Sequence, residues 1–192
     1  MLKIGIILGS TRPNRNGEAV AKWVEQQVKD RNDASYELVD LKGFNLPLLD
    51  EPIPPSQGKY TQPHTKKWAE KIASLDAFIF VTPEYNHATS GALKNALDFL
   101  YAEWNNKAAG FVSYGSAGGA RAVENLRLIM AELQIADVRA QVMFSLFTDF
   151  KNFSEFAPDA RHEPELNTML QQLVAWGEAM KTVREQAAKR AA

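Results

Sequence analysis

Residues 9–17 gather groups that bind anions. The segment reads Gly-Ser-Thr-Arg-Pro-Asn-Arg-Asn-Gly, with neutral donors at Ser10 and Asn16 and guanidinium groups at Arg12 and Arg15. It precedes a helical pattern, and the first N–H groups of a helix lack partners and favour negative charge. A terminal phosphate is the ligand that suits this chemistry. The segment has neither the ending of the nucleotide P-loop nor the dinucleotide fingerprint, which disfavours those two kinds of site.

The same residue types also build turns and cap helices. Two arginines in one short loop favour the phosphate interpretation over a turn that only caps the helix. For Arg15 a second interpretation stays open, because its side chain can also point to solvent or toward another ligand.

Residues 82–91 carry a flat aromatic ring and backbone groups that suit a planar heterocycle. Pro83 stiffens the start of this segment and Tyr85 supplies the ring. In the alternative interpretation, Thr89 or Ser90 caps the following helix and Tyr85 simply packs. The residues alone leave both interpretations open.

Residues 115–119, Gly-Ser-Ala-Gly-Gly, let the backbone approach a ligand closely or turn tightly into a helix. Their order differs from the Gly-x-Ser-x-Gly nucleophile elbow of hydrolases. The three histidines lack the spacing of a metal site, although His87 lies in the aromatic loop and is placed to line a substrate site. We therefore expect no metal centre.

These three loops follow short apolar runs that are typical of strands buried on both faces. Five such runs alternate with helical patterns, at residues 3–8, 36–41, 77–81, 108–114 and 139–144. This alternation predicts a parallel sheet with right-handed crossovers and helices on both faces. We expect an α/β, flavodoxin-like three-layer sandwich with the strand order 2-1-3-4-5. Ligands of that arrangement bind at the carboxyl ends of strands 1 and 3, where the first two loops lie.

Three further segments have more than one interpretation or a less certain boundary. Residues 42–63 are proline-rich and too long for an ordinary connection, which predicts either a lid or an extended wrap over the protein or a partner subunit. Phenylalanines recur every third residue over 144–156, and without a basic excess we expect them to pack. A helix is predicted over 164–185, followed by a frayed tail over 186–192.

The composition limits the chemistry. The chain has 192 residues, 22 Lys+Arg, 23 Asp+Glu and no Cys, with a net charge of −1. Without Cys, redox chemistry needs a bound cofactor. The near-zero charge argues against nucleic acid as a partner. The length predicts a single domain over 1–192, and the lack of a leader or of a roughly 18-residue apolar stretch predicts a cytoplasmic protein without a membrane partner.

Three motifs, GSTRPNRNG, TPEYNHATSGALKNALDF and YGSAGGARA, together resemble the NADPH-dependent FMN reductase family, which includes quinone, azo-dye and chromate reductases. The resemblance covers roughly residues 1–142. It implies that the FMN phosphate is held by Ser10, Arg12, Arg15, Asn16 and Gly17. It implies that the isoalloxazine ring is lined by Pro83, Glu84, Tyr85 and Asn86, with Gly115 and Ser116 nearby. Some members carry Ser-Phe-Asn where this chain has Arg-Asn-Gly at 15–17.

The resemblance also implies an activity. The expected enzyme passes hydride from NADPH or NADH through FMN to a quinone, flavin, azo dye or chromate, and because FMN carries the chemistry no catalytic side chain is expected. Backbone N–H groups near Asn86 and Gly115 would stabilise the reduced ring. The alternative is a flavodoxin-type electron carrier for protein partners, but such carriers tend to be strongly acidic.

The resemblance finally implies a homodimer or a dimer of dimers. Its interface would use the helix that begins near Ala92 and would border the flavin, which would give Trp104 a role. In the alternative interpretation, Trp104 is buried in the core of its own chain.

Overall fold

Five parallel strands form the central sheet in the order β2-β1-β3-β4-β5. The computed structural model describes residues 1–191. The strands are β1 (Leu2–Leu8), β2 (Ala34–Asp40), β3 (Ala77–Pro83), β4 (Lys107–Gly115) and β5 (Ile135–Ser145). The predicted fold class and strand order are therefore confirmed, and every predicted strand lies within or next to an observed one.

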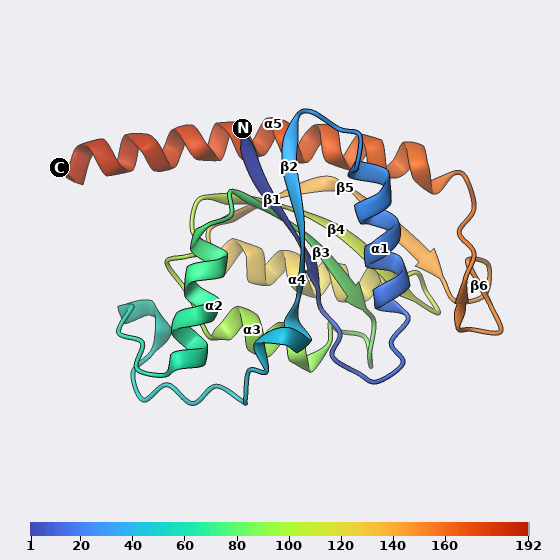
Figure 1. Ribbon diagram of the computed structural model, residues 1–192, viewed down its shortest axis with the longest axis horizontal. Helices are drawn as coiled ribbons and strands as arrows, with labels where there is room; N and C mark the ends of the chain where they lie inside the picture. The colour runs from blue at the N-terminus through green and yellow to red at the C-terminus, as the bar shows by residue number, and fades with distance from the viewer. Residues whose placement is uncertain (192) are drawn as a thin grey trace.

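Backbone hydrogen bonds extend the sheet past the carboxyl ends of the strands. The N–H of Gly9 donates to the carbonyl of Val81 over 2.9 Å, and the N–H of Glu84 donates to the carbonyl of Tyr114 over 3.0 Å. The N–H of Leu146 likewise donates to the carbonyl of Gly115 over 3.0 Å. The loops that follow β1, β3, β4 and β5 therefore leave the sheet in a defined register. Figure 1 shows them on the same side of the molecule.

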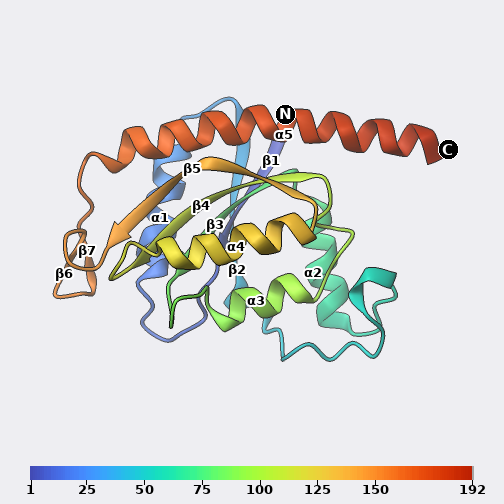
Figure 2. The ribbon, with the colours of Figure 1, turned by 180° about the vertical axis from the view of Figure 1, so that it is seen from behind.

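Helices cover both faces of the sheet. On one face lie α1 (Gly17–Val28) and α5 (His162–Ala191), and on the other lie α2 (Pro63–Ala73), α3 (Gly91–Asp98) and α4 (Ala120–Glu132). Figure 2 shows α4 crossing in front of the sheet with α3 below it, while α5 runs along the opposite side. This three-layer arrangement follows from strands whose side chains alternate between two buried faces.

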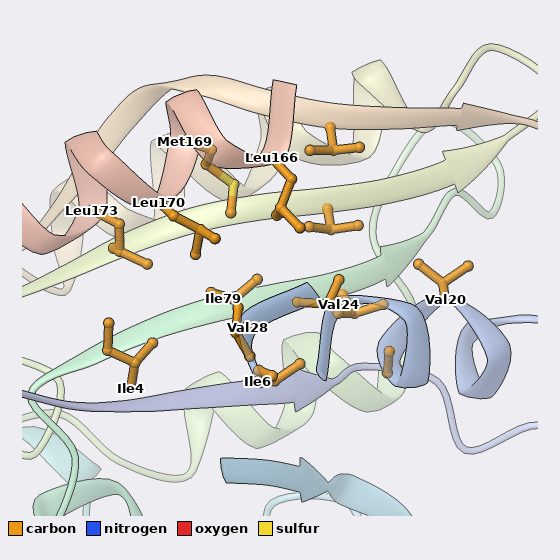
Figure 3. Close-up of a cluster of buried hydrophobic side chains, with 14 of the residues drawn as sticks. Ile4, Ile6, Val20, Val24, Val28, Ile79, Leu166, Met169, Leu170 and Leu173 are labelled. Atoms are coloured by element: carbon orange, nitrogen blue, oxygen red, sulfur yellow. The ribbon is translucent and has the colours of Figure 1, made fainter. Parts of the chain in front are cut away.

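The face under α1 and α5 is filled by aliphatic side chains. Val20 and Val24 of α1 and Leu170 of α5 are fully buried against strand residues such as Ile79 (Figure 3). Burying one such side chain contributes about 1.5–3 kcal/mol. Trp23 closes the edge of this cluster by packing edge-on against the ring of Phe144, with 5.2 Å between the ring centroids.

The opposite face is rich in aromatic side chains. Trp68 and Trp104 are fully buried there, and their ring centroids lie 5.9 Å apart. Trp104 follows α3 and donates its indole N–H to the carbonyl of Leu97 over 3.1 Å. The alternative interpretation of Trp104, burial in the core of its own chain, is therefore the correct one.

The last helix is longer than predicted. It was expected over 164–185, and α5 spans His162–Ala191. Residues 186–191, expected to be frayed, are helical, and residue 192 lies outside the described residues. Figure 1 shows the end of α5 projecting past the sheet. Arg184 fastens this part of the helix to the body by donating to the carbonyl of Asn106 over 2.7 Å and to Asp76 over 2.5 Å.

Residues 42–63 lie against the protein's own surface. The segment includes two short 3-10 helices, η1 (Leu41–Phe44) and η2 (Pro55–Gln57). The side-chain amide of Asn95 in α3 binds this segment on both sides, accepting from the N–H of Leu49 and donating to the carbonyl of Pro47. Glu51 then accepts the N–H groups of residues 61 and 62 at the start of α2. Of the two interpretations, the structure supports the wrap over the protein's own surface.

Residues 146–161 form an excursion between β5 and α5. It contains a two-stranded antiparallel ribbon of β6 (Phe150–Lys151) and β7 (Glu155–Phe156). Phe150 is buried and Phe156 is half-buried, as expected of packing residues, whereas Phe147 and Phe153 are 67% and 58% exposed. The prediction that these phenylalanines pack is thus wrong for Phe147 and Phe153, whose rings contact each other instead of the core.

Candidate functional site

The loops that follow β1, β3 and β4 meet at the carboxyl edge of the sheet. Ser90, at the end of the second loop, donates its hydroxyl hydrogen to the carbonyl of Gly9 in the first. The hydroxyl of Ser10 lies 3.4 Å from the hydroxyl of Tyr85. These contacts bring the predicted phosphate and ring loops together, as the strand order predicts.

The first loop keeps an open set of donors. Among the described residues, no protein acceptor takes the backbone N–H groups of positions 11, 12 and 14–17. Asn16 sits at the N-cap of α1 without a capping side-chain bond. Arg12 is exposed and makes no ion pair with any described residue. A cation, free N–H groups and the positive end of α1 are therefore gathered in this one short loop.

Arg15 occupies a different position from Arg12. Its side chain is 6% exposed, and its guanidinium donates to Asp40 and to the carbonyl of Ser10, each over 2.5 Å. Asp40 ends β2, so Arg15 ties the first loop to the neighbouring strand. The charge of Arg15 is therefore already paired, and its hydrogen bond to the carbonyl of Ser10 fixes the conformation of the loop.

Asn16 and Gly17 close the loop against two other elements. The side-chain amide of Asn16 donates to the carbonyl of Phe153 in the excursion over 2.7 Å. At Gly17, an added Cβ would stand 2.5 Å from the hydroxyl of Tyr114 and 3.0 Å from a methyl group of Leu8. A side chain at position 17 would therefore displace the Tyr114 hydroxyl, which lies directly beneath it.

The second loop contains a tight hairpin. Tyr85 and Ala88 exchange backbone hydrogen bonds of 2.9 and 3.1 Å. Asn86 and His87 form the turn between them with φ values of 51° and 67°, the left-handed conformation that two-residue hairpin loops require. Tyr85 is 39% exposed. The N–H of Asn86 has no acceptor among the described residues, so the hairpin tip presents a ring and a free donor.

Glu84 faces away from the hairpin tip and binds the start of α4. Its carboxylate, 3% exposed, accepts the N–H groups of Arg121 and Ala122 and pairs with the Arg121 guanidinium. Burial alone would raise the pKa of Glu84, but the hydrogen bonds from Arg121 and from the two N–H groups outweigh it and lower that pKa. Arg121 also donates to the ring of His87 over 2.8 Å. Glu84 and Arg121 thus hold the hairpin in place.

Ser90 caps the next helix as the alternative interpretation of this loop predicts. Its hydroxyl accepts the N–H of Leu93 over 3.1 Å. Thr89 instead shares a 2.7 Å hydrogen bond with Thr82. The capping residue and the exposed ring of Tyr85 lie in different parts of the loop, so capping leaves the ring free for a ligand. Pro83 ends β3 and is buried beneath the hairpin.

The third loop turns sharply beside Glu84. Gly118 and Gly119 have φ values of 65° and 77°, and an added Cβ at Gly119 would stand 2.6 Å from the Cβ of Ser113. At Gly115 it would stand 3.1 Å from the Cβ of Glu84. Ser116 is exposed, and its N–H has no acceptor among residues 1–191. This loop brings a second free backbone donor to the hairpin.

The sequence interpretation missed two groups of residues. Tyr114 was assigned to a buried strand, yet its hydroxyl lies beneath Gly17, and only the register of β4 against the first loop reveals this. The excursion contacts the first loop through Phe153, which lies 137 positions from Asn16 along the chain. Contacts at such separations leave no local pattern in the sequence.

No group of three or more His, Asp or Glu side chains within the described residues is arranged to hold a metal ion. None of the described helices combines the length and apolar character needed to cross a bilayer.

Comparisons with known proteins identify the family of the chain. The family model described as NADPH-dependent FMN reductase matches residues 2–149. An NAD(P)H-dependent FMN reductase of Nectria sp is 40% identical over 159 residues, which cover 78% of this chain and 79% of the relative. An NAD(P)H:quinone oxidoreductase of Solanum tuberosum is 32% identical over 134 residues, 67% of each chain.

A solved structure is similar in fold. The flavoenzyme NAD(P)H:(acceptor) oxidoreductase FerB of Paracoccus denitrificans superposes with a TM-score of 0.73 at 18% identity, covering 94% of this chain and 99% of that one. At this identity the likeness concerns the fold alone.

Proposed function

The chain belongs to the NADPH-dependent FMN reductase family, and from this premise we propose that it passes reducing equivalents from NAD(P)H through bound FMN to a quinone or similar small acceptor. The observation that supports this most directly is the open donor set of residues 11–17 beside the hairpin of Tyr85–Ala88. One end of the site suits a phosphate and the other a planar ring.

The residues of the first loop fit a phosphate monoester. In this proposal Ser10, Arg12 and the N–H groups of Asn16 and Gly17 bind the phosphate oxygens. Arg15 contributes indirectly, because its pairing with Asp40 fixes the carbonyl of Ser10 and hence the loop. Charge-assisted hydrogen bonds of this kind are the strong ones in protein–ligand contacts.

The second and third loops fit the isoalloxazine ring. Pro83, Tyr85 and Asn86 would line one side, and Gly115 and Ser116 the other. Glu84 supports them from behind through Arg121. The free N–H groups of Asn86 and Ser116 are placed to stabilise negative charge on a reduced ring.

FMN, when bound, supplies a ring that accepts hydride and gives up electrons. The side chains of this chain bind and orient it, and no acid–base residue is needed for that work. His87 accepts a hydrogen bond from Arg121 at Nε2, which leaves the proton of the neutral ring on Nδ1.

The visible spectrum of the purified protein tests this proposal. We expect a yellow protein whose flavin absorbance bleaches when NADPH is added without oxygen and returns when a quinone follows. A colourless protein that cannot be loaded with FMN would contradict it.

A flavodoxin-type electron carrier is the alternative function. Such carriers tend to be strongly acidic, whereas this chain has a net charge of −1. Steady turnover of NADPH with a soluble quinone distinguishes the enzyme from the carrier. A carrier would show turnover only with a protein partner.

We also propose a homodimer or a dimer of dimers in the cytoplasm. Support comes from Leu48 and Leu49, which are 84% and 41% exposed on the segment that wraps over α3. Light scattering during gel filtration tests the assembly, and cell fractionation tests the location.

A further inference from the structure

Tyr114 carries a buried polar atom for which the protein offers no partner. The residue lies next to the end of β4 and is 5% exposed. Its ring packs near that of Phe150, with 6.3 Å between the centroids. Its hydroxyl is enclosed, yet makes no hydrogen bond with any of the described residues. Buried hydroxyl groups are nearly always paired, because an unpaired one forfeits its bonds to water.

The hydroxyl of Tyr114 points at the start of α1. It lies so close to Gly17 that any side chain there would stand within 2.5 Å of it. The groups that influence its ionisation are Tyr85, Ser10, the N–H of Gly17 and Arg12. These are the residues of the proposed phosphate loop and the tip of the ring loop. The hydroxyl therefore occupies the floor of the site.

The Tyr114 phenol is suited to donate a hydrogen bond. Burial raises the pKa of Tyr114 well above its usual range, so the phenol keeps its proton at neutral pH. Its surroundings otherwise offer donors, namely the N–H of Gly17 and the guanidinium of Arg12. The hydroxyls of Ser10 and Tyr85 are also near, but neither forms a hydrogen bond with the phenol. A phosphate oxygen would supply a strong acceptor for its hydrogen.

We propose that the Tyr114 hydroxyl is a phosphate-binding group, which donates to an oxygen of a phosphate monoester held at the start of α1 by Ser10, Arg12 and the N–H of Gly17. The proposal rests on the proposed function of this site and extends it to a residue outside the phosphate loop. It also explains Gly17, since a side chain there would displace the hydroxyl.

This role makes Tyr114 a determinant of selectivity between two flavins. FMN carries the phosphate and riboflavin lacks it, while both share the ring. With riboflavin, the phenol and the N–H groups stay without a partner, which penalises the smaller ligand.

The test compares both flavins on the cofactor-free protein. Dissociation constants of FMN and riboflavin are measured from the quenching of flavin fluorescence for the wild type, Tyr114→Phe and Tyr36→Phe. Tyr36 is the matched control. Its hydroxyl donates to Asp33, and it pairs with Ile4 in the amino-terminal half of the sheet, away from the loops of the site. For Tyr114→Phe we expect FMN binding about 10- to 100-fold weaker and riboflavin binding changed less than about threefold.

Thermal unfolding gives a second readout. Removing an unpaired buried hydroxyl should leave the cofactor-free protein at least as stable as the wild type. The rise in melting temperature on adding FMN should be smaller for Tyr114→Phe. A merely structural tyrosine would give the opposite result, with a less stable apoprotein and an unchanged rise.

Gly17→Ala provides an independent variant. Alanine suits a helix better than glycine, so α1 itself is not weakened. Its methyl group would push the hydroxyl aside, and we expect weaker FMN binding with little change for riboflavin.

The outcomes separate the two proposals. If Tyr114→Phe keeps the wild-type ratio of FMN to riboflavin affinity, the role of Tyr114 is wrong and the proposed function stands. If the wild type binds both flavins equally, the phosphate site and the role of Tyr114 are wrong while the proposed function stands. If it binds neither flavin, both proposals fall.

Discussion

Arg12 and Arg15 lie three positions apart and have different environments. Arg12 is exposed and unpaired among the described residues, whereas Arg15 is nearly buried against Asp40. We predict that Arg12→Ala changes the free energy of unfolding by less than about 0.5 kcal/mol, yet weakens FMN binding about tenfold or more and reduces its salt dependence. Arg15→Ala should destabilise the fold by about 1–3 kcal/mol.

Urea unfolding and flavin titration measure these two effects. Asp40→Asn is the matched control, since it should resemble Arg15→Ala in stability. Equal losses of stability in Arg12→Ala and Arg15→Ala would contradict the assignment.

Lys107 is a charged residue inside the amino edge of the sheet. It is 4% exposed and donates to the carbonyl of Ile72 at the end of α2 over 2.6 Å. Burial, helped by the nearby charge of Arg184 and opposed by Asp76 and Glu103, lowers the pKa of Lys107 from 10.5 to about 8. Between these values the unfolded chain binds a proton that the folded chain does not, so stability rises with pH.

We predict that Lys107→Met abolishes this rise in stability between pH 8 and 10.5. In the wild type the pKa difference gives a rise of about 3 kcal/mol. Urea titrations at several pH values measure it. Lys66→Met, at an exposed position of α2, should keep the wild-type pH profile. A profile for Lys107→Met that still rises as in the wild type would refute the prediction.

At the scale of elements, the excursion of residues 146–161 depends on one buried carboxylate. Asp149 is fully buried and accepts from the N–H of Ser145 over 2.9 Å and from the ring of His162, also over 2.9 Å. Burial would raise the pKa of Asp149, but hydrogen bonds from the N–H groups of Asp159 and Ser145 and from His162 outweigh it and lower that pKa. This stabilisation is present above the ordinary pKa of an aspartate and is lost as pH falls through the lower folded value.

We predict that Asp149→Asn lowers the free energy of unfolding by about 1–3 kcal/mol at pH 7. The substitution replaces one carboxylate oxygen with an NH2 group, which cannot accept the hydrogen bonds that surround it. The difference from the wild type should shrink near pH 3, below the ordinary pKa of an aspartate, because the unfolded wild-type chain there binds a proton that the folded chain does not. Asp30→Asn, at an exposed position, is the control for urea unfolding. A difference that is the same at both pH values would rule out this role of the carboxylate.

Elements with a strong local pattern were predictable. The apolar runs that became β1 and β4 identified themselves by their lack of alternation, and from them the strand order and the edge that carries the site followed. The boundaries of elements were less predictable. Pro164 suggested the start of α5, but the helix begins at His162, whose ring contacts Asp149 and Glu165.

The site was predictable by position and less so by role. Residue types and the family resemblance located the three loops, but the pairing of Arg15 with Asp40 and of Glu84 with Arg121 joins residues 25 and 37 positions apart. Only the way in which the strands and loops come together in the fold decides which charged groups are paired and which stay free for a ligand.

At the scale of the whole molecule, both apolar clusters share one sheet. Every strand of the central sheet contributes buried side chains to each cluster, so neither face can lose its packing without the other. We predict a single unfolding transition in urea, with the same midpoint by far-ultraviolet circular dichroism and by tryptophan fluorescence.

Two cavity-forming variants extend this prediction. Leu170→Ala in α5 and Leu126→Ala in α4 should each lower the free energy of unfolding by about 2–5 kcal/mol. Each should shift the circular dichroism and fluorescence transitions together. Two separate transitions, or a shift of one signal alone, would mean that the faces unfold independently.

The path of α5 has a practical consequence. The helix starts beside the site and runs back, so that Arg184 reaches Asp76 and Asn106 at the amino edge, where β1 also begins. Both ends of the described chain therefore lie away from the carboxyl edge of the sheet, which carries the candidate site. A tether attached at either end would hold the protein on an electrode or a bead with its proposed cofactor edge turned outward to solution.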